Sequence, residues 1–217
     1  MSITCTDGAD RQASLGCLFI VAAPSGAGKT SLVRALLAQR PGVELSISFT
    51  TREPRPGEEN GVDYFFVSVA QFEAMRASGD LLEWAQVHGN FYGTSRQWIE
   101  GRIQQGADIL LEIDYQGAAQ VRQMFSDAIG VFIAPPSIAQ LRERLIKRGQ
   151  DSPPVIAARL SAAEHELKQI KQFEYVIINQ DFASALGQLV AVVDAARLRF
   201  AKQRIRNQEL FNSWGVV

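Results

Sequence analysis

The chain has 217 residues, 47% of them hydrophobic and 21% charged, which is typical of one globular domain with small insertions. Its formal net charge of −1 at pH 7 excludes the large basic field of a dedicated nucleic-acid-binding protein. No apolar run reaches membrane-spanning length and residues 1–16 lack the order of a signal peptide, so we expect a cytoplasmic protein with neither a membrane nor a nucleic acid as partner.

The chain begins with a polar segment, residues 1–16, for which we expect a mobile arm. Cys5 falls in this arm and Cys17 begins a predicted buried strand, so the two cysteines favour neither a disulfide framework nor a CxxC redox site. His88 and His165 are too few and too far apart for a zinc site.

The first predicted strand, residues 17–23, is a continuous apolar run followed by a glycine-rich segment and then by a helical pattern. This order favours a loop that binds a nucleoside triphosphate over a plain turn. Gly26 and Gly28 let backbone N–H groups point at phosphate oxygens. Lys29 neutralises those oxygens, and Thr30 offers a hydroxyl group to Mg²⁺.

The predicted loop departs from the strict phosphate-loop pattern at one place, because Ala23 stands where that pattern has its first glycine. Alanine fits there if the residue keeps a negative φ angle. The segment predicted to bind ATP consists of Ala23, Pro24, Ser25, Gly26, Ala27, Gly28, Lys29 and Thr30.

Residues 46–97 differ from the flanking segments because they are polar, punctuated by prolines and marked by alternating stretches at 63–67 and 81–87. We predict a small strand-rich insertion with one helix from Val69 to Ser78. Glu83 lies inside an apolar strand of this insertion, so it either alternates to the solvent face or is a carboxylate held in a pocket.

The insertion also carries side chains that suit a phosphate group, namely Arg52, Arg55, Tyr64 and Tyr92. Guanidinium groups bind phosphate oxygens in a fork, and phenol hydroxyls complete the set of donors. Each of these residues alone is more typical of a solvated arginine or a core tyrosine. Their clustering in one insertion favours a ligand.

Short apolar runs recur at residues 109–113, 131–134 and 175–178 and alternate with helical patterns, which predicts a parallel α/β sheet. The last predicted helix runs from about Ser184 to Arg206 and becomes basic at its end. We expect its apolar face to pack on the sheet and its basic residues to be solvated. These residues are Arg197, Arg199, Lys202, Arg204 and Arg206.

Two further helices, at residues 137–149 and 153 to about 172, form a candidate lid. Arg144 and Arg148 lie four residues apart on one face of the first, and Arg159 lies on the second. Spacing alone favours a solvated basic surface over a phosphate-binding one.

Several stretches resemble, in family order, the motifs of bacterial guanylate kinases. They are APSGAGKTSL, SISFTTREPRPGEENGVDYFFVS, EWAQVHGNFYGT, LLEIDYQG, IAPPS, LRERLIKRG and RLSAAEHEL, and together they span residues 17 to about 179. Bacterial members commonly have alanine at the place of Ala23. The resemblance implies a P-loop NTPase-type parallel sheet flanked by helices, with a strand-rich GMP-binding insertion and a helical lid. The implied boundaries are 17–45, 98–138 and 169–217 for the ATP-binding core, 46–97 for the GMP-binding subdomain and 139–168 for the lid.

The activity that this resemblance implies is transfer of the γ-phosphoryl group of MgATP to GMP, and also to dGMP, in purine nucleotide metabolism and GMP recycling. ATP and GMP are the implied partners and Mg²⁺ the implied cofactor. Thr30 is the implied metal-binding residue. Glu112 is a further candidate for the metal shell, although many members have Asp at its position. The implied catalytic residues are Lys29, Arg144, Arg148 and Arg159.

The resemblance also assigns residues to each nucleotide. Asn179 is implied to lie near the adenine of ATP. The residues implied to bind GMP are Ser48, Arg52, Arg55, Tyr64, Glu83, Tyr92, Thr94 and Asp114. Chemistry supports Glu83 independently, because guanine presents N1–H and an amine as adjacent donors, and a carboxylate can accept from both. Adenine has a lone pair in place of N1–H, and a site built on such hydrogen bonds rejects it.

Two other functions stay open. A non-catalytic guanylate-kinase-like binding module would use the same cleft for a phosphopeptide, but such modules typically lose parts of the ATP site, whereas Lys29 and Thr30 are present here. A P-loop kinase for a phosphorylated sugar would explain Arg52 and Arg55 but not the guanine-matching Glu83. Turnover with GMP distinguishes the three.

Overall fold

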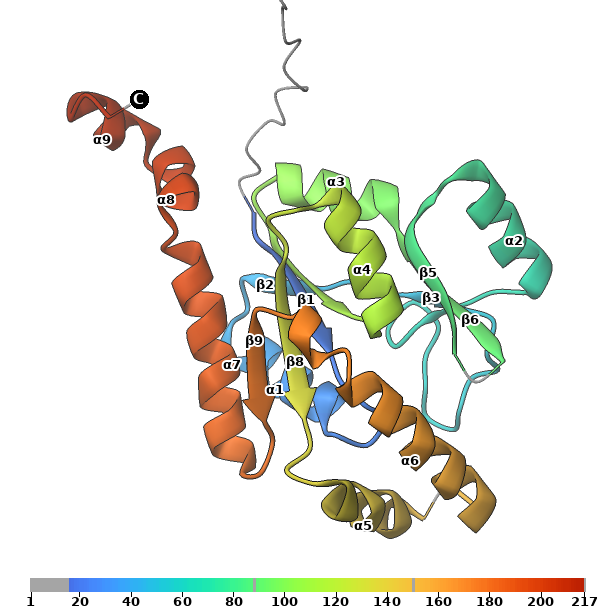
Figure 1. The fold of residues 1–217 in the computed structure, drawn as a ribbon. Coiled ribbons are helices and arrows are strands. Elements are labelled where there is room, and N and C mark those ends of the chain that lie inside the picture. The colour runs from blue at the N-terminus through green and yellow to red at the C-terminus, as the bar shows by residue number, and fades with distance from the viewer. Residues whose placement is uncertain (1–15, 88, 150, 217) are drawn as a thin grey trace, which may run out of the picture.

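The central sheet is parallel. The computed structural model describes residues 16–87, 89–149 and 151–216, so the arm expected at residues 1–16 lies outside the described residues except for Gly16. Five strands of the described chain form one sheet (Figure 1). In spatial order they are β2 (Val43–Leu45), β7 (Asp108–Glu112), β1 (Leu18–Ala22), β8 (Ile129–Ala134) and β9 (Tyr175–Ile178). The predicted parallel α/β sheet is confirmed.

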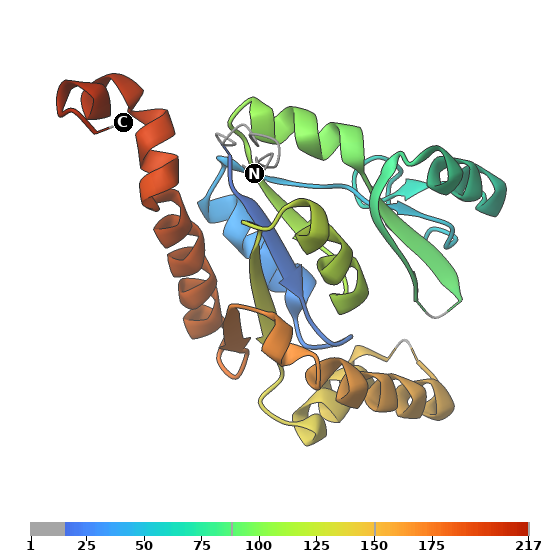
Figure 2. The same ribbon diagram turned by 45° about the horizontal axis from the view of Figure 1, so that its top comes forward.

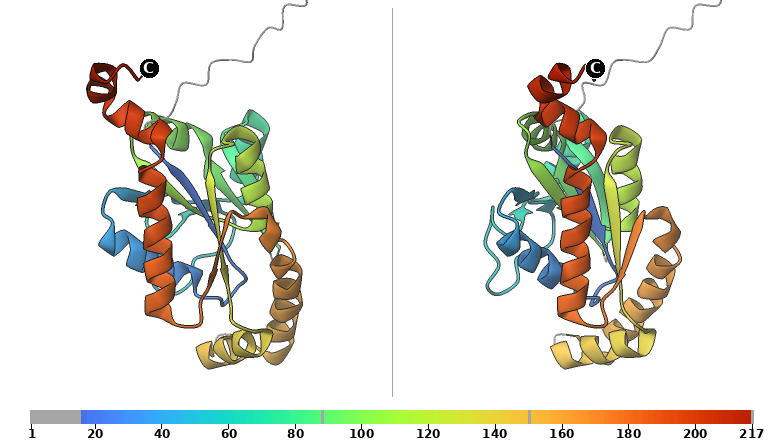
Figure 3. Two further views of the ribbon diagram at one scale, coloured as in Figure 1. Left: turned by 60° about the vertical axis from the view of Figure 1, so that its left-hand side comes forward. Right: turned by 90° about the vertical axis from the view of Figure 1, so that its left-hand side faces the viewer.

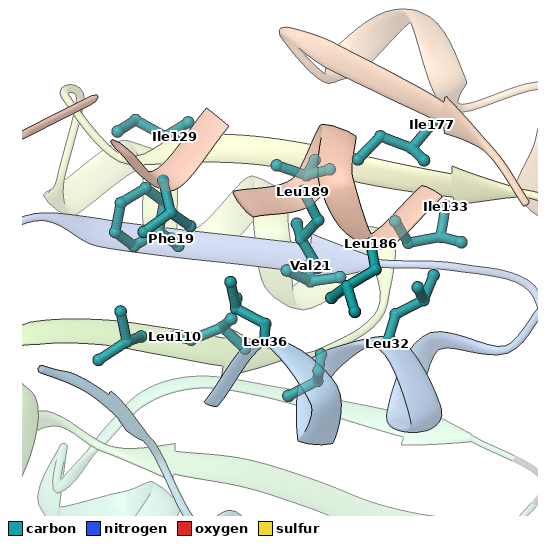
Figure 4. Packing of buried hydrophobic residues seen from close by; sticks show 14 of the residues in the cluster. Phe19, Val21, Leu32, Leu36, Leu110, Ile129, Ile133, Ile177, Leu186 and Leu189 are labelled. Carbon is teal, nitrogen blue, oxygen red and sulfur yellow. The ribbon is translucent and has the colours of Figure 1, made fainter. Parts of the chain in front are cut away.

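Helices cover both faces of this sheet (Figures 1 and 3). One face packs against α1 (Lys29–Gln39) and α7 (Phe182–Arg197), and the other against α3 (Arg96–Gln104) and α4 (Tyr115–Met124). Alternate residues of β1 serve the two layers, since Phe19 and Val21 belong to the first and Ile20 to the second. Figure 4 shows Val21 between the side chains of the first layer. Burying each such side chain stabilises the fold by about 1.5–3 kcal/mol.

The insertion has a sheet of its own. In spatial order its strands are β4 (Phe65–Phe66), β3 (Phe49–Thr50), β6 (Asn90–Ser95) and β5 (Leu81–Val87). The predicted helix is confirmed as α2 (Val69–Ser78), which begins with a capping box between Ser68 and Gln71 and ends at Gly79 with φ of 76°. Figure 2 shows α2 and this sheet beside α3 and α4 rather than on the central sheet.

The two candidate lid helices lie beyond the carboxyl ends of β1 and β8 (Figure 1). They are α5 (Ile138–Arg148) and α6 (Pro153–Leu167). Ser137 caps α5 by accepting a hydrogen bond from the Gln140 N–H, and Gly149 ends it, as the sequence predicts. The second helix is shorter than expected, because a separate 3₁₀ turn (η1, Ile170–Gln172) replaces its last residues.

The prediction of a single helix from Ser184 to Arg206 is wrong. The helix breaks at Leu198–Arg199, which separates α7 from α8 (Phe200–Arg206), and a further short helix, α9 (Gln208–Ser213), follows. Polar contacts accompany the break. Asp108, 3% exposed, accepts hydrogen bonds from Arg197, Arg206 and the Cys17 N–H, and Lys202 donates to the Gly16 carbonyl at 2.7 Å. The expectation that all five basic residues are solvated therefore fails for the buried Lys202 and the partly buried Arg197, whereas Arg206 stays exposed although it pairs with Asp108. Burial raises the pKa of the Cys17 thiol to about 11, which keeps this thiol protonated.

Candidate active site

Residues 23–28 form the turn between β1 and α1, with Gly26 and Gly28 at φ of 91° and 96°. A side chain at either glycine would be strained, because L-residues rarely adopt this region. Space is also short. A Cβ at Gly28 would lie 2.4 Å from the Asn179 amide nitrogen, and one at Gly26 would lie 2.9 Å from a methyl group of Leu145. The loop therefore needs glycine at both positions.

Asn179 and Arg144 brace this loop from outside. The Asn179 side chain, on a residue 5% exposed, donates to the Ala27 carbonyl at 2.8 Å. Arg144 donates to the Asn179 carbonyl at 2.7 Å and to the Ala27 carbonyl at 3.4 Å. These contacts bring α5 and the end of β9 onto the loop. The Asn179 amide, expected near adenine, therefore contacts the phosphate loop itself.

The first turn of α1 presents Lys29 and Thr30 to the end of β7. Lys29 Nζ donates to the Ile113 carbonyl at 3.3 Å, and the Thr30 hydroxyl donates to the Glu112 carboxylate. These oxygens suit Mg²⁺, which prefers hard oxygen ligands and keeps several waters or phosphate oxygens. Among the described residues no three His, Cys, Asp or Glu side chains gather as a metal cage.

The two arginines of the insertion that are predicted to bind a phosphate group, Arg52 and Arg55, both contact Glu58. Arg52 donates to both Glu58 oxygens at 2.9 Å, and the Arg55 N–H donates to Oε2 at 2.7 Å. Burial opposes ionisation of Glu58, but its hydrogen bonds with Arg52 and Arg55 lower its pKa. The Arg55 side chain is exposed. These contacts hold Arg52 in place before any ligand binds.

Two tyrosines stand beside Arg52. The Tyr64 and Tyr92 rings meet edge to face at 6.0 Å, and the Arg52 guanidinium lies 5.5 Å from the Tyr64 ring centre. Burial, with a contribution from the Glu112 charge, raises the pKa of Tyr64 to about 12, so its hydroxyl stays a hydrogen-bond donor. Tyr64 also lines a small pocket with Ser48 and Glu112. This pocket lies between the insertion and the end of β7, where the oxygen atoms suited to Mg²⁺ are found.

The residues predicted to bind the guanine base lie where the insertion meets α4. Glu83 is 3% exposed, and Thr94, fully buried, donates to its Oε1 at 2.6 Å. A Cβ at Gly117 would lie 2.4 Å from Glu83 Oε2, so α4 leaves room for this carboxylate only because it has glycine there. Asp114 caps α4 by accepting from the Gly117 N–H at 2.9 Å. Burial raises the pKa of Glu83 to about 7, and the Asp114 charge adds to the rise.

The other lid arginines do not reach the phosphate loop in this structure. Arg159 forms an ion pair with Asp151 at 3.0 Å, and these side chains are only 15% and 8% exposed. Arg148 is exposed on α5. Of the three arginines predicted to act together, the structure therefore brings Arg144 alone against the loop.

Three residues with notable contacts escaped the sequence predictions. Glu58 lies three residues after Arg55 in the quoted motif, a spacing that was a usable signal. Glu166 of α6 lies near Lys29; burial raises its pKa to about 7 although the Lys29 charge opposes the rise. Gln120 of α4 binds the backbone of β5, a contact between distant segments for which the sequence carries no signal.

Comparisons with known proteins identify the family of the chain. The family model described as guanylate kinase matches residues 16–196. The guanylate kinase of Cupriavidus metallidurans is 58% identical over 93% of this chain and 93% of its own length, and that of Dechloromonas aromatica is 59% identical over 90% and 97%. The crystal structure of guanylate kinase from Anaplasma phagocytophilum superimposes with a TM-score of 0.75 at 30% identity, covering 94% of this chain and 97% of that one.

Proposed function

Because the chain belongs to the guanylate kinase family and is an ATP:GMP phosphotransferase, we propose that residues 23–30 bind the phosphates of ATP and that the insertion of residues 46–97 binds GMP. The observation that carries the assignment is the buried carboxylate of Glu83. A buried carboxylate is costly unless a ligand or a partner satisfies it, and guanine supplies two adjacent donors.

The reaction moves the γ-phosphoryl group of ATP onto a phosphate oxygen of GMP and yields ADP and GDP. The attacking oxygen is already anionic, so the protein needs no general base. Its residues must instead align the two nucleotides and neutralise charge that spreads over the moving group. Lys29, in the first turn of α1, is the fixed cation for this role.

GMP has two anchors in this proposal. Arg52, Arg55, Tyr64 and Tyr92 hold its phosphate, with Glu58 keeping Arg52 oriented. At the other end Glu83 accepts from N1–H and the exocyclic amine. The remaining base contacts are assigned to Ser48, Thr94 and Asp114. AMP would place a lone pair against Glu83, which a site of this kind rejects by about 10⁴-fold or more. The contacts named here spare the ribose, so dGMP is expected to react as well.

Mg²⁺ fits beside the phosphate loop. The Thr30 hydroxyl and the Glu112 carboxylate are already in contact, and both supply the oxygen atoms that Mg²⁺ prefers. When bound, the ion would neutralise charge on the ATP phosphates. Tyr64 keeps its proton beside this site and can donate to an adjacent phosphate oxygen.

The lid completes the proposed site. Closure of α5 and α6 would add Arg148 and Arg159 to Arg144, and Arg159 would exchange Asp151 for phosphate. A lid that closes on both nucleotides keeps out water, which competes with GMP as an acceptor. With ATP and GMP as its partners, we place the enzyme in the cytoplasm. Within the described chain, no helix has both the length and the apolar character to cross a membrane.

An acceptor profile tests this proposal. Release of ADP from MgATP is measured with GMP, AMP, CMP, UMP or a phosphorylated sugar in separate reactions. We expect turnover with GMP far above all the others. Turnover with the sugar phosphate but not GMP would contradict the guanine pocket. Binding of GMP without any turnover would instead contradict the proposed roles of Lys29 and the lid arginines.

A further inference from the structure

The outer edge of β5, which has no neighbouring strand, is bound by one side chain of α4. β5 is the outer strand of the insertion sheet, so backbone groups on its far side have no neighbouring strand. The Trp84 N–H donates to Gln120 Oε1 at 3.2 Å, and Gln120 Nε2 donates to the Trp84 carbonyl at 2.7 Å. The Gln120 amide thus exchanges two hydrogen bonds with one residue, as an opposed residue does in an antiparallel sheet.

This contact lies next to the proposed guanine acceptor. Glu83 directly precedes Trp84, and the strand register shifts between Leu81 and Glu83. Such a bulge changes the direction of nearby side chains, so the strand alone does not fix where the Glu83 carboxylate lies. The double hydrogen bond at Trp84 sets the position of the strand immediately after the bulge.

The same helix also forms the wall behind the carboxylate. Gly117 lies three residues before Gln120, on the same side of α4, and its missing side chain gives Glu83 Oε2 its space. One turn of α4 therefore binds the strand through Gln120, and the preceding turn leaves space for the carboxylate at Gly117. A change in the distance between α4 and β5 would move Glu83 relative to a bound base.

We propose that Gln120 is a positioning residue for guanine recognition: its amide ties β5 to α4 and so places the Glu83 carboxylate opposite the N1–H and amine of GMP. The inference rests on the proposed role of Glu83. Gln120 does not touch the substrate, and it acts through the backbone of Trp84.

The decisive measurement compares GMP with IMP, which lacks the exocyclic amine. Gln120→Met keeps the length of the side chain but removes both hydrogen bonds, each of which contributes modestly to stability. We expect KM for GMP to rise about 10-fold, with kcat within about 2-fold and KM for ATP unchanged. The preference in kcat/KM for GMP over IMP should fall by a similar factor, because a displaced carboxylate loses the contact with the amine.

Two further variants make the result interpretable. Gln123→Met places the same substitution on an exposed position of the same helix and should leave all constants unchanged. Glu83→Gln tests the acceptor itself, and it should abolish most of the preference for GMP over IMP. If Glu83→Gln leaves that preference intact, the proposed guanine pocket fails. If Glu83→Gln reduces it while Gln120→Met does not, the positioning role alone fails.

Folding of the variants is monitored independently. A purely structural role would lower the thermal midpoint or the yield of folded enzyme without changing the GMP to IMP ratio, and that outcome would overturn the proposal. If Gln120→Met does not fold, Gln120→Glu is measured in its place. Glutamate keeps the acceptor for the Trp84 N–H, but its second oxygen repels the Trp84 carbonyl, so a fall in the same ratio is expected. An unchanged ratio in folded Gln120→Glu would equally overturn the proposal.

Discussion

Lys29 places its charge where the phosphate loop meets the end of β7, since its Nζ donates to the Ile113 carbonyl at 3.3 Å. This hydrogen bond is with a backbone group and not with a side chain proposed to bind GMP. The two nucleotide sites should therefore respond separately to single substitutions.

For Lys29→Ala we expect kcat to fall by about 10²-fold or more, because a fixed cation at the transferred phosphoryl group is lost. The affinity for GMP should stay within about 2-fold, since Arg52 and Tyr64 are unaffected. Steady-state kinetics and calorimetric titration with GMP measure the two quantities. Lys171→Ala, at an exposed lysine, is the control. An equal loss of GMP affinity would refute this division between the two sites.

Glu83 predicts a pH dependence of GMP binding. Burial raises its pKa to about 7, so below that pH the free enzyme holds a protonated carboxyl, which cannot accept from both guanine donors. GMP affinity should rise as pH increases from about 5.5 to 8, and binding near pH 6 should release a proton. Calorimetry in two buffers of different ionisation enthalpy measures that release. The phosphate group of GMP also titrates near pH 6. In Glu83→Gln only this phosphate contributes to the change in proton release, so the difference from the wild type gives the contribution of Glu83.

The stability of the folded, ligand-free enzyme changes with pH in the opposite direction to its affinity for GMP. A carboxyl whose pKa is raised on folding stabilises the folded state when protonated, and this contribution is lost as pH rises through about 7. The ligand-free enzyme should therefore lose stability between about pH 5 and 8 relative to Glu83→Gln. A difference between these two proteins that is flat with pH would show that Glu83 is not protonated in the empty site.

At the scale of elements, the phosphate loop depends on its contact with the end of β9. Gly28 caps α1 at positive φ, and Asn179 fills the space that a side chain would need. The loop, α1 and the last strand of the sheet therefore form one unit, although about 150 residues separate them in sequence.

Gly28→Ala should abolish most activity and lower the free energy of unfolding by about 1–2 kcal/mol from the left-handed conformation alone, with more from the clash with Asn179. Gly187→Ala is the matched control. It places the same methyl group on an exposed, helical position of α7 with nothing within 4 Å, so it should stabilise by up to about 1 kcal/mol. Urea unfolding and the ADP-release assay measure both variants. Equal behaviour of the two would contradict the steric argument.

The sequence predicted those helices and strands that have a clear local pattern, such as a capping residue or a continuous apolar run. The helix at Val69–Ser78 has a cap at each end, and the buried strands of the central sheet are continuous apolar runs, so both follow from short stretches of sequence. Strands of two or three residues, such as Phe49–Thr50, are too short to show a period. The break at Leu198–Arg199 accompanies contacts with Asp108 and Gly16, which lie far away in sequence.

The candidate site divides in the same way. Gly26, Gly28, Lys29 and Thr30 sit in one contiguous motif, and their chemistry could be argued from it. The contacts of Gln120 with Trp84 connect residues 36 apart, so they could not be argued from local pattern. A single sequence without aligned relatives carries no information on such pairs.

At the scale of the whole molecule, Asp108 ties the C-terminal helices to the sheet. Its side chain, 4% exposed, pairs with Arg197 at 2.5 Å and Arg206 at 3.1 Å and caps the Cys17 N–H at 2.7 Å. These partners come from α7, α8 and the residue just before β1. The arrangement anchors the end of the sheet opposite the phosphate loop (Figure 1).

Asp108→Ala should lower the free energy of unfolding by about 3 kcal/mol or more, because two guanidinium groups and one backbone N–H lose their common partner. Asp194→Ala removes a carboxylate from a far more exposed pair with Arg40 and should change stability little. Urea unfolding compares them. At temperatures where the Asp108 variant stays folded, its KM for GMP should match the wild type, and a raised KM would mean that this anchor also shapes the distant site.

The pairing of Arg52 with Glu58 gives the empty enzyme a form of ionic selectivity. A bare arginine would bind any anion that can accept its hydrogen bonds, inorganic phosphate and sulfate included. Here one guanidinium nitrogen, Nη2, already donates to both oxygens of the Glu58 carboxylate, so a small anion gains little by replacing or sharing that carboxylate. GMP would also gain the proposed contacts at Glu83, which a small anion cannot make. Inorganic phosphate should thus inhibit the wild type weakly and Glu58→Gln more strongly, which competition against GMP would measure.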